Sequence, residues 1–129
     1  MIFKGIIIEE SLNKKDVLGR LKIKSTKIEP VIDKHKTSWL KQWTLHTVEV
    51  SEGEVETIAK EISECLELEH PWYADFKNES IHFIIFLNKV FKIDRTSKEE
   101  YNQAREYGLL LGIPSHQVDF HPEVKAWER

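Results

Sequence analysis

Residues 81–95 read IHFIIFLNKVFKIDR, and this stretch decides the fold that we expect. Its β-branched and aromatic residues, interrupted by Asn88-Lys89, predict two antiparallel strands joined by a two-residue turn. Both faces of this hairpin are apolar toward its tip, whereas an antiparallel sheet with one solvated face alternates apolar and polar residues. The second face therefore needs a cover. The alternatives are curvature that closes the sheet on itself, a ligand or another copy of the chain.

Further strands are predicted on the N-terminal side of this hairpin. The first two predicted strands, 2–9 and 20–30, are expected to pair with each other. The last three, 72–77, 81–87 and 90–95, are expected to form a meander with a tight turn near Asn78-Glu79. A short edge strand is expected at Val118-Asp119-Phe120. In chain order, the predicted strands are 2–9, 20–30, 43–50, 72–77, 81–87 and 90–95.

Two amphipathic helices are also predicted. The first begins at Ser51, because its hydroxyl and the carboxylate of Glu54 have the spacing of a capping box. Apolar residues then recur at helical spacing from Val55 to Leu66. The second helix begins at Thr96 or Ser97, again with a glutamate three residues on, and ends at Gly112-Ile113-Pro114.

The element order βββ-α-βββ-α predicts an α+β domain. We expect a strongly curved antiparallel sheet of about six strands with both α-helices packed on one face. The chain of 129 residues contains no repeat or linker and suffices for one globular domain, 1–129. Because symmetric dimers are the commonest oligomers, we expect curvature together with a homodimer to cover the second sheet face.

Composition argues against several classes of protein. The hydrophobic share of 40% is too high for a disordered chain, and no apolar run approaches the roughly 20 residues that cross a bilayer. A pI near 6.1 argues against a dedicated nucleic-acid-binding protein. The single cysteine excludes a disulfide framework. The first ten residues, interrupted by Lys4 and ended by Glu9-Glu10, predict a strand rather than a signal peptide, so we expect a cytoplasmic protein.

Charge is unevenly distributed along the chain. The segment from Lys14 to Lys41 is rich in lysine, and the segment from Glu49 to Glu69 is rich in glutamate. One interpretation is a basic face for an anionic partner, whose binding would weaken steeply with salt. The other is two solvated faces that attract each other within one fold.

The meander predicts a row of groups suited to acid–base chemistry. With tight turns, Asp75 lies opposite His82, His82 lies opposite Arg95, and Tyr73 shares their face. A carboxylate beside a histidine fixes the imidazole tautomer, as a general acid or base requires. In a cofactor-independent enzyme, Asp75 would orient His82 and Arg95 would hold an anionic substrate group. This hypothesis needs an open cleft, and full burial of His82 would exclude it. The alternative is an ordinary polar row across the sheet.

Aromatic residues surround the second half of the predicted sheet. Trp43, Trp72 and Tyr73 would wall a ligand pocket, with His46 among its polar groups. The same aromatics would equally form the core of a domain of this size. His46 stands on an otherwise apolar strand face, so the alternative for it is a buried histidine that is hydrogen-bonded to a neighbour.

The residues predict neither a metal nor a cofactor. No two histidines have the i,i+2 or i,i+4 spacing of strand or helix ligands. No glycine-rich phosphate loop and no serine-nucleophile motif is present. Cys65 lies on the apolar stripe of the first predicted helix, so it is expected in the core rather than as a nucleophile.

Three further stretches are WTLHTVE at 43–49, HPWYADFKN at 70–78 and NKVFKIDR at 88–95. They resemble a family of small prokaryotic proteins that has no assigned activity. The similarity covers most of the chain. The resemblance implies a prokaryotic cytosolic protein, and it carries over no substrate, cofactor or site residue.

Two functions therefore stand against each other. The first is a ligand-binding or protein-interaction domain with an aromatic-lined surface on the meander, and the second is the enzyme. In the first case, Trp72→Ala should weaken association far more than His82→Ala. In the second, His82→Ala should abolish turnover and leave the fold intact.

Overall fold

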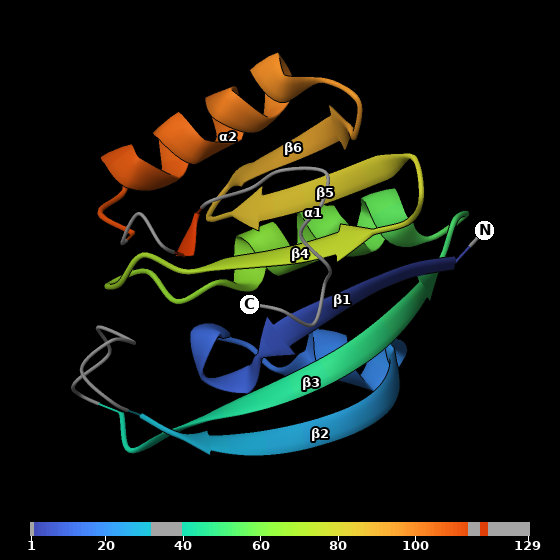
Figure 1. Cartoon of the computed structure of the whole chain (residues 1–129). Helices are drawn as coiled ribbons and strands as arrows, with labels where there is room; N and C mark the ends of the chain where they lie inside the picture. Colours follow the sequence, from blue (N-terminus) through green and yellow to red (C-terminus); the bar gives the residue numbers. More distant parts are fainter. Residues whose placement is uncertain (1, 32–39, 114–116, 119–129) are drawn as a thin grey trace.

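The computed structural model describes residues 2–31, 40–113 and 117–118, and it confirms the predicted α+β fold. All strand pairs in the described residues are antiparallel, and the strands form one sheet. The sheet bends but does not close on itself (Figure 1). The strands are β1 (Ile2–Ile8), β2 (Lys22–Pro30), β3 (Gln42–Ser51), β4 (Tyr73–Lys77), β5 (Ile81–Phe86) and β6 (Lys89–Asp94).

The strand order is β2-β3-β1-β4-β5-β6, which places β1 inside the sheet. β1 pairs with β3 along its whole length and with β4 over Lys4–Ile6. The predicted pairing of the first two strands is therefore wrong, because β2 pairs with β3 and forms an edge. Burial explains the order: Phe3 and Ile7 of β1 belong to the core, whereas every residue of β2 except Glu29 is exposed.

The two helices are α1 (Val55–Cys65) and α2 (Lys98–Leu110). The predicted capping box of α1 is not formed, because Ser51 is the last residue of β3 and Glu54 provides no side-chain cap. α2 begins as predicted after Ser97, whose Oγ accepts a hydrogen bond from the backbone N–H of Glu100 at 3.2 Å. No helix among the described residues is long and apolar enough to cross a membrane.

The helices lie on opposite faces of the sheet, which corrects the prediction of both on one face (Figure 1). On one face, here called the α1 face, Ile58 of α1 shares a core with Phe83 of β5. On the other, the α2 face, Tyr101 of α2 shares a core with Ile84 of β5. The hairpin is apolar on both sides because its own chain covers each side. The second face therefore requires neither a ligand nor a second copy.

The connection from β1 to β2 extends the cover of the α1 face. It contains the 3-10 helices η1 (Glu9–Ser11) and η2 (Asp16–Arg20). Leu12 and Val17 are buried in the same core as α1. On the α2 face, by contrast, α2 packs on β5 and β6, and no described helix covers β3 and β2. Val118 is buried beside α2, and the remainder of the predicted edge strand, Asp119 and Phe120, lies outside the described residues.

Both turns of the meander differ from the prediction by a register shift of two residues. Phe86 pairs with Lys89, so the loop is Leu87-Asn88 rather than Asn88-Lys89. Asn88 has a φ of 56°, a left-handed conformation that asparagine adopts more readily than most residues. Lys77 pairs with His82, which shifts the register at the preceding turn by two residues in the opposite direction. A shift of two residues keeps every side chain on its predicted face, because side chains alternate along a strand with a period of two.

The residues just before α2 give a prediction about pH. The backbone N–H and the hydroxyl of Thr96 donate to Asp94 Oδ1 at 2.9 and 2.7 Å, and these hydrogen bonds hold the pKa of Asp94 below its usual value. Their stabilisation is present above the pKa of the unfolded chain and is lost as pH falls through the lowered pKa of the folded chain. We expect Thr96→Ala to raise this pKa toward its usual value in an NMR titration of the carboxyl carbon. Thr57→Ala, on the exposed side of α1, is the control. An unchanged Asp94 pKa in Thr96→Ala would contradict the assignment.

Candidate functional site

The structure joins two of the predicted catalytic residues, Asp75 and His82. Asp75 lies opposite Ile84 rather than His82, but it shares a sheet face with His82, which is two residues along β5 from Ile84. The two side chains therefore meet diagonally, with 2.6 Å between His82 Nε2 and Asp75 Oδ2. The other ring nitrogen, Nδ1, lies 3.1 Å from the hydroxyl oxygen of Tyr101 in α2. A carboxylate that accepts from Nε2–H and a hydroxyl that donates to Nδ1 satisfy a neutral imidazole.

This Asp75–His82–Tyr101 chain is buried. His82 is 0% exposed and Asp75 is 3% exposed. A general acid or base has to lie within hydrogen-bonding distance of its substrate, directly or through one water. The enzyme hypothesis required an open cleft at His82, and the structure places His82 in the core instead. The hydrogen bonds of His82 connect α2 to the centre of the sheet.

Arg95 lies outside this chain of hydrogen bonds. It follows β6, and its backbone N–H donates to the carbonyl of Ser80 at 3.0 Å. Its Nη1 donates to the carbonyl of Asn78 at 2.5 Å, so the guanidinium braces the turn between β4 and β5. The prediction of Arg95 opposite His82 is therefore wrong, because the residue opposite His82 is Ile93.

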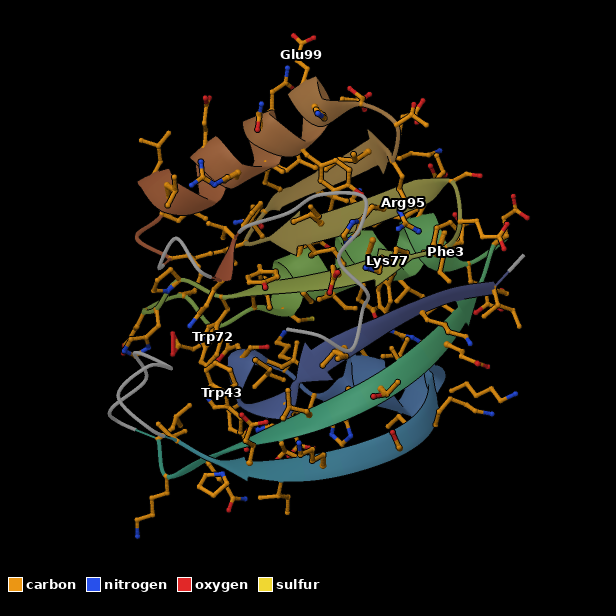
Figure 2. All side chains as sticks on the ribbon, viewed as in Figure 1. Phe3, Trp43, Trp72, Lys77, Arg95 and Glu99 are labelled. Atoms are coloured by element: carbon orange, nitrogen blue, oxygen red, sulfur yellow. The ribbon has the colours of Figure 1, made fainter. Side chains whose placement is uncertain are left out.

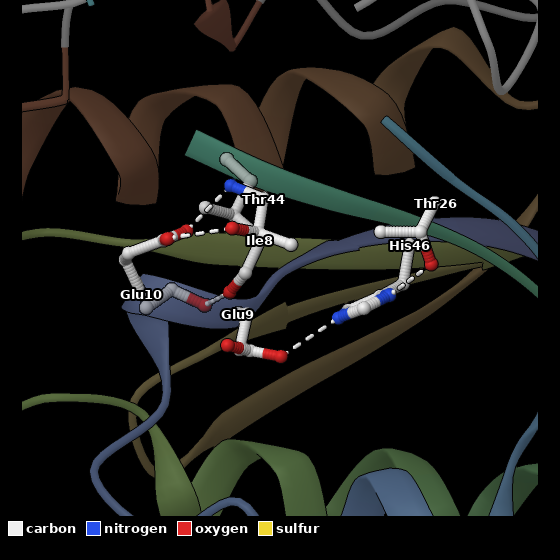
Figure 3. Close-up of polar contacts among 7 residues, drawn as sticks. Ile8, Glu9, Glu10, Thr26, Thr44 and His46 are labelled. Atoms are coloured by element: carbon white, nitrogen blue, oxygen red, sulfur yellow. Dashed lines mark hydrogen bonds and ion pairs between the residues drawn. The ribbon is translucent and has the colours of Figure 1, made fainter. Parts of the chain in front are cut away.

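His46 belongs to a second polar cluster, on the α1 face near the edge of the sheet (Figure 3). His46 is 7% exposed, which matches the alternative of a buried, hydrogen-bonded histidine. Its Nε2 lies 3.0 Å from Glu9 Oε1, and its Nδ1 lies 2.9 Å from Thr26 Oγ1. The histidine thereby links η1, β3 and β2, three segments that are far apart in the sequence.

Glu10 strengthens the same junction. Its carboxylate accepts from the backbone N–H of Thr44 at 2.6 Å and from the hydroxyl of Thr44 at 2.8 Å. Adjacent residues of a strand point to opposite faces, so Glu9 and Glu10 would diverge if they continued β1. They lie instead in the 3-10 helix η1, from which both side chains reach β3 (Figure 3). No sequence signal distinguished this short helix from the end of the strand.

The order hydroxyl, imidazole, carboxylate in Thr26, His46 and Glu9 is the order of groups in an activated nucleophile. An open cavity of about 400 Å³ lies elsewhere, between α1 and the β5–β6 hairpin, where Phe83, Val90 and Lys92 are among its lining residues. We interpret the His46 cluster as the junction that holds β2 and η1 on β3, because His46 is buried and its two ring nitrogens contact Glu9 and Thr26.

The residues predicted to wall one ligand pocket lie at different places on the sheet. Trp43 and Trp72 meet at one end of the sheet, with ring centroids 5.9 Å apart (Figure 2). Tyr73 packs on Phe86 at 6.3 Å, within the core under α2. His46 lies on the opposite sheet face from Trp43, because the two are three residues apart on β3. Over the residues described, no group of three or more His, Cys, Asp or Glu side chains is arranged to hold a metal ion.

The most accessible feature of the described sheet is β2. This strand is nine residues long, and its pattern of burial is exposed at every position except Glu29. Within the described ranges it has a strand partner on one side, β3, and its other edge is open. Two large apolar side chains are among its exposed residues, Ile23 at 40% and Ile28 at 60%. The edge strand β6 at the other side of the sheet is shorter and contacts both helices.

No family model, curated protein or solved structure matches the chain.

Proposed function

We propose that this chain is a protein-interaction domain that binds an extended segment of a partner along the open edge of β2. The observation that supports this proposal is that the nine-residue strand β2 is exposed on both faces and is an edge strand of the described sheet. An edge strand presents a row of backbone N–H and C=O groups that pair readily with another extended chain. Strand addition uses these groups for affinity and uses the alternating side chains for specificity.

The rest of the domain holds β2 in place for this role. β2 pairs with β3 from Lys22 to Pro30, with a bulge between Ile23 and Ser25. The hydrogen bond between Thr26 and His46 adds a side-chain tie in the regular part of the strand. Because β2 is already ordered before binding, only the partner segment has to become ordered. This lowers the entropic cost of association.

Two earlier expectations are revised within this proposal. The interaction surface moves from the meander to β2, because Trp72, Phe83 and Phe86 of the meander are buried in the core. The argument for a homodimer depended on an uncovered apolar face, and α2 covers that face. The prokaryotic origin, the cytoplasmic location and the absence of a nucleic-acid partner stay predictions from the sequence, and a small-molecule ligand is not proposed.

Binding at β2 is testable with short synthetic peptides. Two nine-residue peptides are used, one that alternates valine with glutamine and one that alternates valine with glutamate. We expect their binding to slow amide hydrogen exchange along residues 22–30, as measured in ¹⁵N NMR spectra. Exchange in α2 serves as the internal reference. Slowed exchange around the cavity between α1 and β6, or at no position for either peptide, would contradict strand addition at β2.

Proline substitutions give a matched pair of variants for the same test. Adjacent residues of an antiparallel strand direct their N–H groups to opposite edges. Of Ser25→Pro and Thr26→Pro, one (the outward variant) therefore removes an N–H group that faces the open edge. The other (the inward variant) removes an N–H group that faces β3. The outward variant should fold normally and lose peptide binding, and the inward variant should lose stability. Ser25→Ala and Thr26→Ala control for the side chains. Equal peptide affinity in the outward variant would rule out pairing through the backbone of β2.

A further inference from the structure

We infer that the segment bound at β2 is an acidic strand of another protein, with carboxylates on the α2 face and apolar side chains on the α1 face. This inference rests on the proposed function and adds the chemistry of the partner. It follows from the charges along β2, from the positions of its apolar side chains and from the pairing that a second copy of the chain would impose.

The edge is basic in a protein whose net charge is -3. β2 contains Lys22, Lys24 and Lys27 against the single acidic residue Glu29, which gives the strand a net charge of three minus one, or +2. Two of these lysines form ion pairs at the outer limit of distance: Lys22 Nζ lies 3.9 Å from Glu49 Oε1, and Lys27 Nζ lies 3.9 Å from Glu29 Oε2. Exposed ion pairs of this length contribute little, so both ammonium groups can interact with carboxylates of a partner.

The register assigns these charges to one face. Lys22 and Lys27 are paired with Glu49 and Leu45 of β3, whose side chains lie on the α2 face, whereas Lys24 lies at the bulge. The exposed Ile23 and Ile28 are paired with Val48 and Thr44 of β3, on the α1 face. A partner strand continues the sheet, so its side chains alternate between the same two faces. Carboxylates at every second position would then lie beside the lysines, and apolar residues between them would lie beside the isoleucines.

A second copy of the chain fits this edge less well. If two β2 strands paired, the sheet would continue through the interface, and both sets of Lys22 and Lys27 would lie on one face. Lysines on an edge strand are a common device against pairing between identical strands. The same residues that attract an acidic strand therefore keep two copies of this chain apart.

Single-stranded nucleic acid is also anionic, but it is bound by aromatic platforms on which its bases stack. β2 contains no aromatic residue, and its exposed apolar residues are isoleucines. Alternation of lysine with isoleucine fits an amphipathic strand of protein better than a polynucleotide.

The test compares the anisotropy of labelled nine-residue peptides that alternate valine with glutamate, glutamine or lysine. We expect the glutamate peptide to bind about tenfold more tightly than the glutamine peptide at 50 mM salt, and this ratio to fall to about two at 500 mM because surface charges are screened. The variant Lys22→Glu/Lys24→Glu/Lys27→Glu should lose this preference and favour the lysine peptide. The control is Lys60→Glu/Lys89→Glu/Lys98→Glu, which changes three exposed lysines outside β2.

The other outcomes overturn the inference in distinguishable ways. Equal binding of the glutamate and glutamine peptides would overturn the acidic partner and leave strand addition standing. Binding of neither peptide would overturn the proposed function as well. Tighter binding of a nine-nucleotide oligothymidine than of the glutamate peptide would identify a nucleic-acid partner. Sedimentation measurements would identify a second copy as the occupant if they detect a dimer and if Lys27→Glu makes this dimer dissociate less readily.

Discussion

Gly5→Ala is expected to destabilise this domain strongly. A Cβ atom at residue 5 would lie 1.8 Å from the backbone oxygen of Asp75 and 2.7 Å from Cδ1 of Phe76. The first contact is with backbone, so it is relieved only if β1 and β4 separate. These two strands pair over three residues, Lys4–Ile6, and this pairing joins the halves β2-β3-β1 and β4-β5-β6. We expect a loss of roughly 3 kcal/mol or more in the free energy of unfolding, a large fraction of a typical domain's stability.

The chain offers two matched controls for this substitution. A Cβ atom at Gly19 or Gly53 would meet no atom within 4 Å. Gly19→Ala and Gly53→Ala should therefore change the free energy of unfolding by less than about 1 kcal/mol. Urea denaturation followed by tryptophan fluorescence measures all three variants. A Gly5→Ala protein as stable as the controls would show that β1 and β4 are not paired as described.

The second large effect is expected at His82. His82→Leu removes the imidazole that lies between Asp75 and Tyr101, and it leaves the carboxylate of Asp75 in the core without this partner. Leaving a buried hydrogen-bonding group without its partner costs roughly 1–3 kcal/mol, and more for a carboxylate, because Asp75 loses this hydrogen bond and regains no water. We expect the midpoint of urea unfolding to fall accordingly, with near-native secondary structure by circular dichroism at low urea.

Tyrosine variants separate the hydrogen bond from the packing around it. Tyr101→Phe keeps the ring and removes the hydroxyl that contacts His82, so we expect a loss of about 1 kcal/mol. Tyr107→Phe, also on α2 and packed on Phe86, is the matched control and should change stability by a few tenths. Equal stability of His82→Leu and the unmodified protein would show that the Asp75–His82 contact does not contribute to the fold.

Local patterns explain why much of the fold was predictable. The alternation of β4, β5 and β6 and the helical spacing of α1 and α2 arise from contacts between near neighbours, and the structure contains all of these elements. The shared face of Asp75 and His82 was predicted correctly even though both turns were misplaced. An error of two residues in register changes which residues are opposite and does not change which face they occupy.

Strand order and helix placement were not predictable in this way. No local pattern near β1 indicates that its partners are β3 and β4, since these pairs join residues at least 37 positions apart. The turn η1, which aims Glu9 and Glu10 at β3, carries no signature that separates it from a strand end. The same holds for the contact between His82 and Tyr101, because it depends on the face of the sheet that α2 covers.

The sequence by itself therefore determined the elements, their order, the faces of the strands and the basic character of the segment that becomes β2. The tertiary structure decided that this basic segment is an open edge and that the apolar hairpin lies between two helices. The physical reason is that periodicity and charge are local properties of the chain. The position of a strand in a sheet, by contrast, depends on which strands bury their apolar side chains against one another. Those contacts form only when segments that are distant in the sequence meet.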